Sequence, residues 1–205
     1  MLRPLCADDA PALTAAAAES REHYGFTTVP DGSNEVQLYL DKAFRQQRKG
    51  TRLAFTIMWH DRVVGTTSFF DLQFWEWPAG TPRQRDDAPD AVEIGYTWLA
   101  ASAQRTIVNS EAKSLLLQHA FETWQVHRLC LRTDVRNLRS WRAIERLGAR
   151  FEGVRRADMP GRDGSVRDSA IFAIVAAEWP EVKAHLGTLV HVDVARECLK
   201  HLFPF

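Results

Sequence analysis

A single carboxylate stands in a run of otherwise apolar and aromatic residues. Glu93 belongs to segment 92–99, VEIGYTWL, which has the β-branched and aromatic composition of a strand. Burial disfavours the charged form of a carboxylate, so we expect the pKa of Glu93 to be raised. A carboxylate of raised pKa can accept a proton near neutral pH, which makes Glu93 a candidate general base. An equally good alternative is an ion pair with an arginine on a neighbouring strand.

A possible anion site follows this strand. The polar turn that begins at residue 100 leads into a helix, whose first N–H groups have no intrahelical partner and carry the positive end of the helix dipole. A pyrophosphate suits such a place. Arg105, Ser110 and Lys113 would add hydrogen bonds and charge to the phosphates. Taken alone, however, the segment 104–110 is better explained as an ordinary helix start.

Asn137 opens another helix, which we expect to run to Leu147 and to end at Gly148 in the C′ position. The side-chain amide offers both a donor and an acceptor to a ligand. The alternative is that Asn137 only caps the helix, and both roles are compatible.

Several classes of chemistry are disfavoured. The histidines show no HxxxH or HExxH spacing, and no CxxC pair is present, so we expect no metal. We expect His119 and His127 to be surface or cap groups. No GxSxG elbow or Cys–His pair indicates a hydrolase. Lys and Arg total 26, as do Asp and Glu, and this zero net charge counts against nucleic-acid or membrane binding. Three irregularly spaced cysteines and an N-terminus without an apolar core predict a reduced, cytoplasmic protein.

The order of elements predicts an α/β fold with a mixed sheet in one domain. Segments 53–59 and 63–70 form a hairpin, and the strand–helix–strand unit 92–133 should be parallel and right-handed. Helices should cover both faces of the sheet. The further expected elements are a short strand at 2–5, a helix opened by Asp8 and Asp9, a helix capped by Ser33 or Asn34, strands near 150–156 and 167–175, and a helix from 178 to about 186.

Five segments in order form a recognisable pattern: EIGYTWL (93–99), QRTIVNSEAKSLLLQHAFE (104–122), TDVRNLRSWRAIERLGA (133–149), FEGVRR (151–156) and RDSAIFAIVAAEWP (167–180). The pattern resembles the GNAT acyltransferase superfamily, most closely the branch with the ribosomal-protein N-terminal alanine acetyltransferases. The resemblance covers residues 2–186. It implies a mostly antiparallel sheet whose central parallel strand pair is splayed to hold acetyl-CoA.

The resemblance also implies roles for the motif residues. The family turn Q/R-x-x-G-x-G/A binds the pyrophosphate of coenzyme A, and here Gln104 matches whereas Ile107 and Asn109 replace the glycines. A β-branched residue at position 107 disfavours positive φ and close backbone approach. Asn137 is expected to bind the pantetheine arm. The implied cofactor-binding residues are Trp98, Leu99, Gln104, Arg105, Thr106, Ile107, Val108, Asn109, Ser110 and Asn137.

Backbone N–H groups near 96–98 are expected to polarise the thioester carbonyl. Ile144 replaces a tyrosine that serves many members as the acid, and Ser140 matches the serine that takes this role in the N-terminal alanine branch. A serine bonded to its own helix backbone is the alternative for Ser140.

The long loop 71–91 resembles a substrate gate in position. We expect Trp75, Trp77 and Tyr96 to contact the substrate, although exposed aromatic residues can equally cover a core edge. Acidic residues at 76, 86 and 87 would favour a cationic amine, and a solvated acidic loop is the simpler alternative.

The predicted function is therefore acetyl transfer from acetyl-CoA to a primary amine, on a protein N-terminus or a small molecule, by direct attack. Glu93 is the candidate base and Ser140 the candidate acid. A non-catalytic module that binds CoA or another small ligand through the altered turn is the alternative. Residues 1–186 form the catalytic domain, and residues 187–205, with an amphipathic helix at 192–203, form a packing arm or a homodimer contact.

Overall fold

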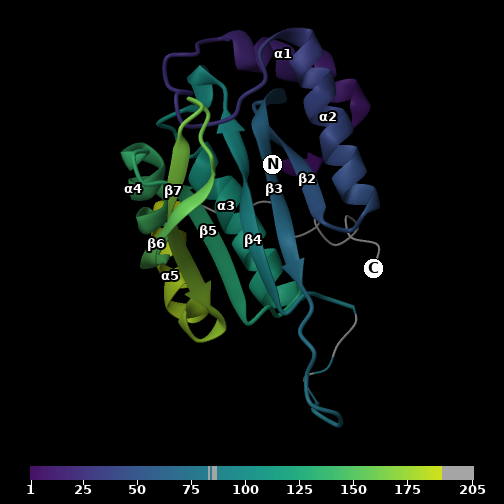
Figure 1. The fold of residues 1–205 in the computed structure, drawn as a ribbon, viewed down its shortest axis with the longest axis vertical. Coiled ribbons are helices and arrows are strands. Elements are labelled where there is room, and N and C mark those ends of the chain that lie inside the picture. Colours follow the sequence, from purple (N-terminus) through teal and green to yellow (C-terminus); the bar gives the residue numbers. More distant parts are fainter. Residues whose placement is uncertain (83, 85–86, 191–205) are drawn as a thin grey trace.

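The computed structural model describes residues 1–82, 84 and 87–190. Within this part of the chain a seven-stranded sheet has the order β1-β2-β3-β4-β5-β7-β6 (Figure 1). The strands are β1 (Leu2–Pro4), β2 (Arg52–Trp59), β3 (Arg62–Gln73), β4 (Ala91–Leu99), β5 (Arg128–Asp134), β6 (Arg150–Pro160) and β7 (Val166–Val175). The helices are α1 (Ala10–Ala18), α2 (Gly32–Arg48), α3 (Val108–Gln118), α4 (Leu138–Arg146) and α5 (Trp179–Leu189).

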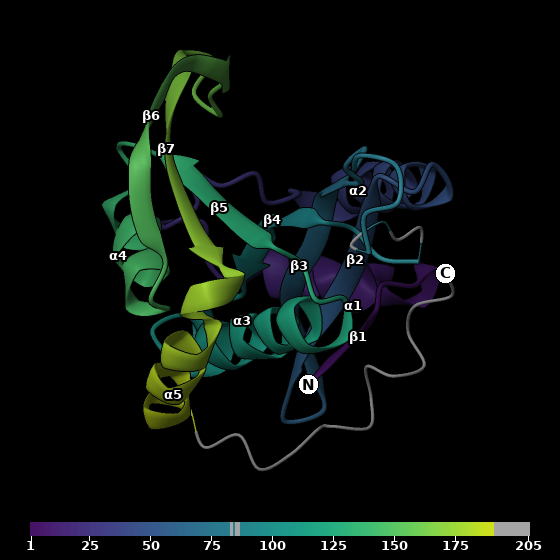
Figure 2. The same ribbon diagram turned by 90° about the horizontal axis from the view of Figure 1, so that it is seen from below.

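The sheet is mixed, as predicted. The pair β4–β5 is parallel, and the other neighbouring strands are antiparallel. The hairpin β2–β3 and the parallel unit β4–α3–β5 are confirmed. The hairpin β6–β7 is longer than the sequence indicated, and its tip bends away from the plane of the sheet (Figure 2).

Helices cover both faces of the sheet, which confirms the predicted layers. Thr66 and Thr67 are successive residues of β3, so their side chains point to opposite faces. The Thr66 hydroxyl contacts Tyr39 of α2 at 2.7 Å, whereas the Thr67 hydroxyl accepts from Lys113 of α3 at 3.3 Å. Figure 2 shows the same division, with α2 on one side of the sheet and α3 and α5 on the other.

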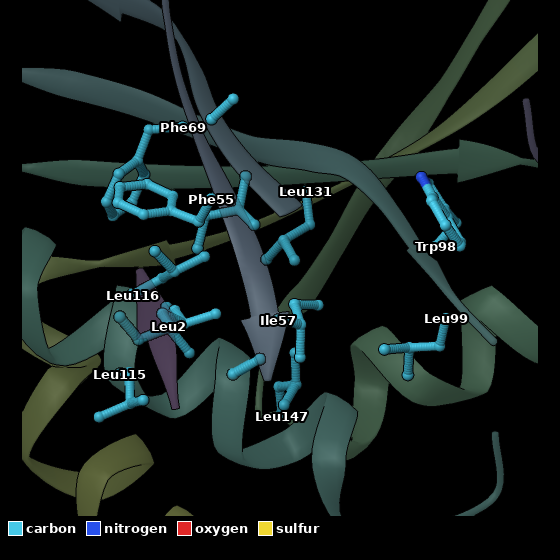
Figure 3. Close-up of a cluster of buried hydrophobic side chains, with 14 of the residues drawn as sticks. Leu2, Phe55, Ile57, Phe69, Trp98, Leu99, Leu115, Leu116, Leu131 and Leu147 are labelled. Carbon is cyan, nitrogen blue, oxygen red and sulfur yellow. The ribbon is translucent and has the colours of Figure 1, made fainter. Parts of the chain in front are cut away.

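The core on the α3 face is aromatic and aliphatic (Figure 3). Phe55 and Phe69 meet edge to face at 6.1 Å between ring centroids. Leu116 of α3 and Leu131 of β5 are buried in the same cluster. Burying a side chain of this size contributes roughly 1.5–3 kcal/mol, so the cluster fixes α3 against the strands that must hold the site.

Helix α4 begins and ends where capping chemistry predicts. Asn137 is the N-cap of α4, and its side chain accepts a hydrogen bond from the Ser140 N–H at 3.1 Å. The chain leaves α4 at Gly148 with φ of +91°, a left-handed conformation that favours glycine. Glu111 lies in the first turn of α3, as expected from the helix dipole.

The start of α2 was predicted wrongly. Its N-cap is Asp31 rather than Ser33 or Asn34. The Asp31 N–H donates to the Glu35 carboxylate at 2.8 Å, and Gly32 follows with φ of +74°. These two features let the helix begin earlier than the apolar spacing alone indicates.

The expectation that His119 lies at the surface was also wrong. A π-helical turn (His119–Thr123) continues α3, and its wider winding turns His119 inward. The imidazole packs 4.8 Å from the Trp124 ring and is 4% exposed. Burial lowers the pKa of His119 to about 4, so the ring is neutral at physiological pH.

The parallel strands β4 and β5 separate after three paired residues. Their register runs from Ala91–Arg128 to Glu93–Cys130 and then stops, although β4 continues to Leu99 and β5 to Asp134. The carboxyl-terminal halves of the two strands therefore diverge. Such an opening exposes backbone groups at the strand edges to a ligand. The splayed central pair expected from the resemblance is confirmed.

A β-bulge in β4 lies on this opening. Thr66 and Ser68 of β3 pair with Trp98 and Gly95 of β4, so β4 carries one residue more than β3 between these pairs. The bulge residue Tyr96 has φ of +51°. Such a conformation is rare for a residue with a side chain and persists only when its surroundings hold it.

The C-terminal part of the chain is described only to residue 190. The final helix α5 begins after Glu178, as predicted, and runs to Leu189. The predicted helix at 192–203, most of the proposed arm and Asp86 lie outside the described residues. Within the described ranges no helix is long and apolar enough to cross a membrane.

Candidate active site

Glu93 is buried at the last paired position before β4 and β5 separate. It is 6% exposed, and its Oε1 lies 2.8 Å from Nε of Arg132 on β5. Arg132 also contacts Asp158 of β6 at 3.4 Å, so its charge is shared between two carboxylates. Burial raises the pKa of Glu93 to about 7, although Arg132 acts in the opposite direction. The ion pair expected as one alternative for Glu93 is therefore present. The role of Glu93 as a general base stays a prediction.

The bulge residues line the opening beside Glu93. Tyr96 is 38% exposed, and its ring meets that of Phe70 at 5.1 Å in an edge-to-face contact. Phe70 is the register partner of Glu93 and also lies 5.6 Å from the Arg132 guanidinium. The rings of Phe70 and Tyr96 thus lie between the Glu93 position and the bulge.

The turn before α3 adopts a conformation that the sequence did not predict. Ile107, the N-cap of α3, is right-handed helical with φ of −69° and ψ of −18°. The positive φ, +61°, falls on Arg105 instead. The expected strain at position 107 is therefore absent, and the loss of the family glycine leaves the helix start intact. The Val108 N–H donates to Thr106 Oγ1, whereas the next N–H groups of an α-helix have no intrahelical partner.

Gln104 fixes this turn to the surrounding elements. Its Nε2 donates to the Leu99 carbonyl at 3.0 Å, and its Oε1 accepts from Arg139 of α4 at 3.1 Å. Tyr24 also donates to the Leu99 carbonyl, at 2.8 Å. The end of β4, the turn and α4 are thereby held together. A cavity of about 220 Å³ beside the turn is lined by Ser20, Glu22, His23, Ala101, Gln104 and Arg105.

Two arginines of α4 bring charge to the turn, whereas Lys113 does not. Arg139 contacts Gln104, and Arg146 donates to the Ser110 hydroxyl at 3.4 Å. Ser110 itself is buried, at 4% exposed. The expectation that Lys113 reaches the phosphates was wrong, because its ammonium points into the sheet and donates to threonine hydroxyls.

Trp98 supplies a test of whether the opening suits a ligand with amide groups. Its side chain is 3% exposed, and within the described residues its indole N–H is buried without a hydrogen-bond partner. It lies on the side of the core cluster away from Phe55 and Phe69 (Figure 3). An unpaired buried donor costs about 1–3 kcal/mol, and a carbonyl of a bound pantetheine chain would remove that cost. Trp98 thus offers a donor of the kind that an amide carbonyl of coenzyme A accepts from.

Comparisons with known proteins agree with this geometry. The family model described as "Acetyltransferase (GNAT) domain" matches residues 1–150. The chain belongs to the GNAT acetyltransferase family. A search of curated protein sequences gives no match.

Three solved structures place this family member among its structural neighbours. A GCN5-related N-acetyltransferase from Brucella melitensis is 27% identical with a TM-score of 0.75, covering 92% of this chain and 81% of that one. Mycobacterium smegmatis RimJ, in complex with CoA-disulfide, is 22% identical with a TM-score of 0.73, covering 91% and 87%. RimL, a ribosomal L7/L12 alpha-N-protein acetyltransferase in complex with coenzyme A, is 18% identical with a TM-score of 0.66, covering 85% and 92%. The last two share the fold of this chain.

Asn137 and Ser140 flank the opening of this GNAT domain from the β5 side. Asn137 follows the end of β5 by three residues and uses its Oδ1 as the helix cap, which leaves its Nδ2 donor for a ligand. Ser140 is half-buried in the first turn of α4. Within the described part of the chain its hydroxyl makes no hydrogen bond to its own helix, so the structural alternative for Ser140 is not observed.

The two roles of Asn137 can be separated by substitution. We expect Asn137→Ala to lower both the stability and the affinity for acetyl-CoA, because it removes the cap, at a cost of about 1 kcal/mol, and the Nδ2 donor. Asn137→Asp keeps a capping oxygen but loses the donor. It should retain the melting temperature and still lose affinity, as measured by calorimetric titration. Equal affinity of Asn137→Asp and the parent chain would restrict Asn137 to capping.

The tryptophans of the loop between β3 and β4 are anchored at the amino-terminal ends of β4 and β5. The loop is shorter than the predicted 71–91, because β3 extends to Gln73 and β4 begins at Ala91. Trp75 donates through its backbone N–H, and Trp77 through its indole N–H, to the buried carboxylate of Asp90 at 2.8 and 3.0 Å. Both rings lie 5.5 Å from the His127 ring. The loop thus packs around Asp90, next to the amino-terminal ends of β4 and β5. A gating role for Trp75 and Trp77 stays a prediction.

Sequence reasoning missed residues whose partners come from distant elements. Arg139 and Arg146 were not singled out, although they contact Gln104 and Ser110. Arg132 is the arginine on a neighbouring strand that was expected as an alternative partner of Glu93. In the sequence, the only local sign that these arginines could reach the site is that they lie close to Asn137 along the chain, on β5 and α4. Among the described residues no group of three or more His, Cys, Asp and Glu side chains is placed to hold a metal ion.

Proposed function

We propose that this GNAT family member is an acetyl-CoA-dependent N-acetyltransferase that acts on primary amines. The observation that carries the proposal is the position of Glu93. A buried carboxylate with a pKa of about 7 stands where the parallel pairing of β4 and β5 ends. A protonated amine, whose pKa is about 8 for an α-amino group and about 10.4 for lysine, must lose a proton before it attacks a thioester. Glu93 is the group of the opening that can take this proton, directly or through a water molecule.

Acetyl-CoA would lie between β4 and β5. Its pyrophosphate would accept hydrogen bonds from the N–H groups at the start of α3, with Arg139 and Arg146 adding charge. The Nδ2 of Asn137 and the indole N–H of Trp98 would donate to the pantetheine arm. The thioester carbonyl would then face the bulge at Tyr96 and Thr97, whose N–H groups polarise it.

The reaction would proceed by direct attack. The amine nitrogen forms a bond to the thioester carbon, and the carbonyl electron pair moves to oxygen, where the bulge N–H groups stabilise the negative charge. The proton of the amine passes to Glu93. The oxyanion electron pair then re-forms the carbonyl as the C–S bond breaks. The thiolate of coenzyme A takes a proton from the Ser140 hydroxyl, or from a water molecule that Ser140 orients, and the second proton of the acetylated nitrogen replaces it. The products are an amide and the free thiol, and no covalent enzyme intermediate forms.

The acceptor panel that tests this proposal should span both predicted classes of amine. The purified chain would be mixed with acetyl-CoA and with peptides that carry a free N-terminal alanine or serine, a polyamine, an aminoglycoside or free amino acids. Release of coenzyme A thiol above the rate without amine, together with an acetyl mass increment on the amine, would support the proposal. Binding of acetyl-CoA without thiol release for any amine would favour the alternative of a non-catalytic binding module.

A further inference from the structure

Two buried cations flank the β4 bulge, one on each face of the sheet. Lys113 reaches it from α3, with Nζ 2.6 Å from Thr97 Oγ1, and is 6% exposed. Arg52 reaches it from β2, with the guanidinium carbon 3.8 Å from the centroid of the Tyr96 ring, and is fully buried. The two cations thus contact consecutive residues of the bulge that faces the opening.

Neither cation has a carboxylate partner within the part of the chain that the structure describes. Lys113 donates to the hydroxyls of Thr97 and Thr67. Arg52 donates to the side chains of Ser68, Gln46 and Tyr39 at 2.8, 3.3 and 2.7 Å. An uncompensated buried charge is costly. The cost of burying two such charges at one bulge suggests that they act on the backbone groups of the bulge.

Each cation is connected to a backbone carbonyl of the bulge through hydroxyl groups. Lys113 donates to Thr97 Oγ1, which donates to the Gly95 carbonyl at 3.3 Å. Arg52 donates to the Tyr39 hydroxyl, which contacts Thr66 Oγ1 at 2.7 Å. Thr66 Oγ1 in turn donates to the Tyr96 carbonyl at 3.2 Å.

These carbonyls belong to the peptide groups whose N–H groups are those of Tyr96 and Thr97. Hydrogen bonds in a chain polarise one another, so a peptide group that accepts a strong hydrogen bond at its oxygen becomes a stronger donor at its nitrogen. Tyr96 and Thr97 lie between the paired positions Gly95 and Trp98 and have no register partner in β3. Their N–H groups are the ones that the proposed function assigns to the thioester carbonyl.

We propose that Lys113 and Arg52 are positioning residues that strengthen the two bulge N–H donors and thereby polarise the thioester carbonyl. Lys113 acts through the hydroxyl of Thr97, and Arg52 acts through the hydroxyls of Tyr39 and Thr66. We call each of these hydrogen-bond chains a relay. This inference rests on the proposed binding of acetyl-CoA. Neither cation touches the substrate. A buried positive charge acts on the bulge peptide groups more strongly than it would in water, because the dielectric constant of the protein interior is low.

The direct test is the infrared carbonyl band of acetyl-CoA labelled with ¹³C at the acetyl carbonyl. Bound to the parent chain, the band should move to lower wavenumber than in water. In Lys113→Met and in Thr97→Val the shift should be smaller, and the double variant should equal the single ones because both cut the same relay. Thr66→Val, which cuts the Arg52 relay without removing the buried arginine, should also reduce the shift. Lys42→Met, an exposed lysine of α2, is the matched control and should leave the band unchanged.

Turnover and its pH dependence separate the relay from a structural role. We expect kcat to fall about tenfold in Lys113→Met with KM for acetyl-CoA unchanged, less than the loss of a direct oxyanion donor. Burial lowers the pKa of Lys113 to about 7. The ratio of parent to Lys113→Met kcat should therefore be largest below pH 7 and fall toward one above it, where the lysine is neutral. A purely structural lysine would give a ratio independent of pH.

The side chains that contact Lys113 do not titrate and so do not affect the pH dependence of the ratio of parent to Lys113→Met kcat. Those facing its ammonium are the Thr67 hydroxyl of β3 and the Thr97 hydroxyl of β4. The pKa of Lys113 is lowered by burial, and among the described residues its ammonium contacts no titratable side chain.

Failure of this inference differs from failure of the proposed function. The infrared band could shift in the parent chain and not in the variants while no amine is acetylated. That result would support the relay and contradict the proposed transfer activity. Equal band positions in the folded parent chain and variants would overturn the relay and leave the activity standing. Absence of acetyl-CoA binding would overturn both.

Discussion

Glu93→Gln should lower kcat for amine acetylation by about a hundredfold or more while the affinity for acetyl-CoA stays unchanged, because a general base typically contributes 10²–10⁴-fold. The glutamine keeps the size of the side chain and a carbonyl oxygen near Arg132, which limits structural damage. It cannot take up the proton of the amine. Steady-state kinetics on the most active amine of the panel, with calorimetric titration of acetyl-CoA, measure the two quantities separately.

The pKa of Glu93 predicts the direction in which the effect of Glu93→Gln on kcat changes with pH. Burial raises the pKa of Glu93 to about 7, so below that pH the carboxyl is protonated and cannot act as a base. The ratio of parent to Glu93→Gln kcat should rise with pH through 7, opposite to the ratio for Lys113→Met. Arg132→Gln removes the cation that lowers the pKa of Glu93, so the midpoint should move to higher pH. Glu181→Gln, an exposed glutamate of α5, should behave like the parent chain; a flat ratio for Glu93→Gln would exclude the base role.

Gly65→Ala should destabilise the protein more than any other glycine substitution near the site. A Cβ on Gly65 would lie 2.0 Å from the Trp98 carbonyl oxygen, and the backbone φ is +154°. The obstructing atom belongs to the backbone of β4, so relief requires that β3 and β4 move apart beside the bulge. We expect a loss of about 4 kcal/mol or more, among the largest that single substitutions cause. For a chain of this length this lowers the melting temperature by about 10 °C, which calorimetry or circular dichroism can measure.

Gly153 provides the matched control for Gly65. Its φ is +148°, close to that of Gly65, but a Cβ there would meet nothing within 4 Å. Gly153→Ala therefore reports the backbone strain alone, about 1–3 kcal/mol. The difference between the two variants isolates the clash with β4. Similar melting temperatures for both would show that β3 and β4 are not held as closely as the structure indicates.

The sequence predicted those parts of the site that depend on local patterns. Glu93 stands out because a charged residue interrupts an apolar strand, and Asn137 because a capping residue precedes a helix that ends in glycine. The parallel pairing of β4 and β5 follows from the right-handed β–α–β rule, but the register that places Glu93 at the end of this pairing comes from the structure. Their joint position on one opening was implied by the resemblance to a family rather than by the residues themselves.

The parts that could not be predicted depend on contacts between distant elements. Lys113 reads as a surface residue of a polar helix start, and its burial follows from the meeting of α3 with Thr67 and Thr97. The positive φ in the turn before α3 falls on Arg105 rather than on position 107, which the family motif does not indicate. The anchoring of Trp77 needs Asp90, thirteen residues away across a loop without periodic pattern.

The central claim is that the opening between β4 and β5 binds acetyl-CoA, and calorimetric titration of the purified chain with acetyl-CoA tests it most directly. The account predicts binding in the micromolar range, about −8 kcal/mol, that weakens in Asn137→Asp although this variant keeps the melting temperature of the parent chain. Absence of binding at millimolar acetyl-CoA to the folded protein would contradict the account.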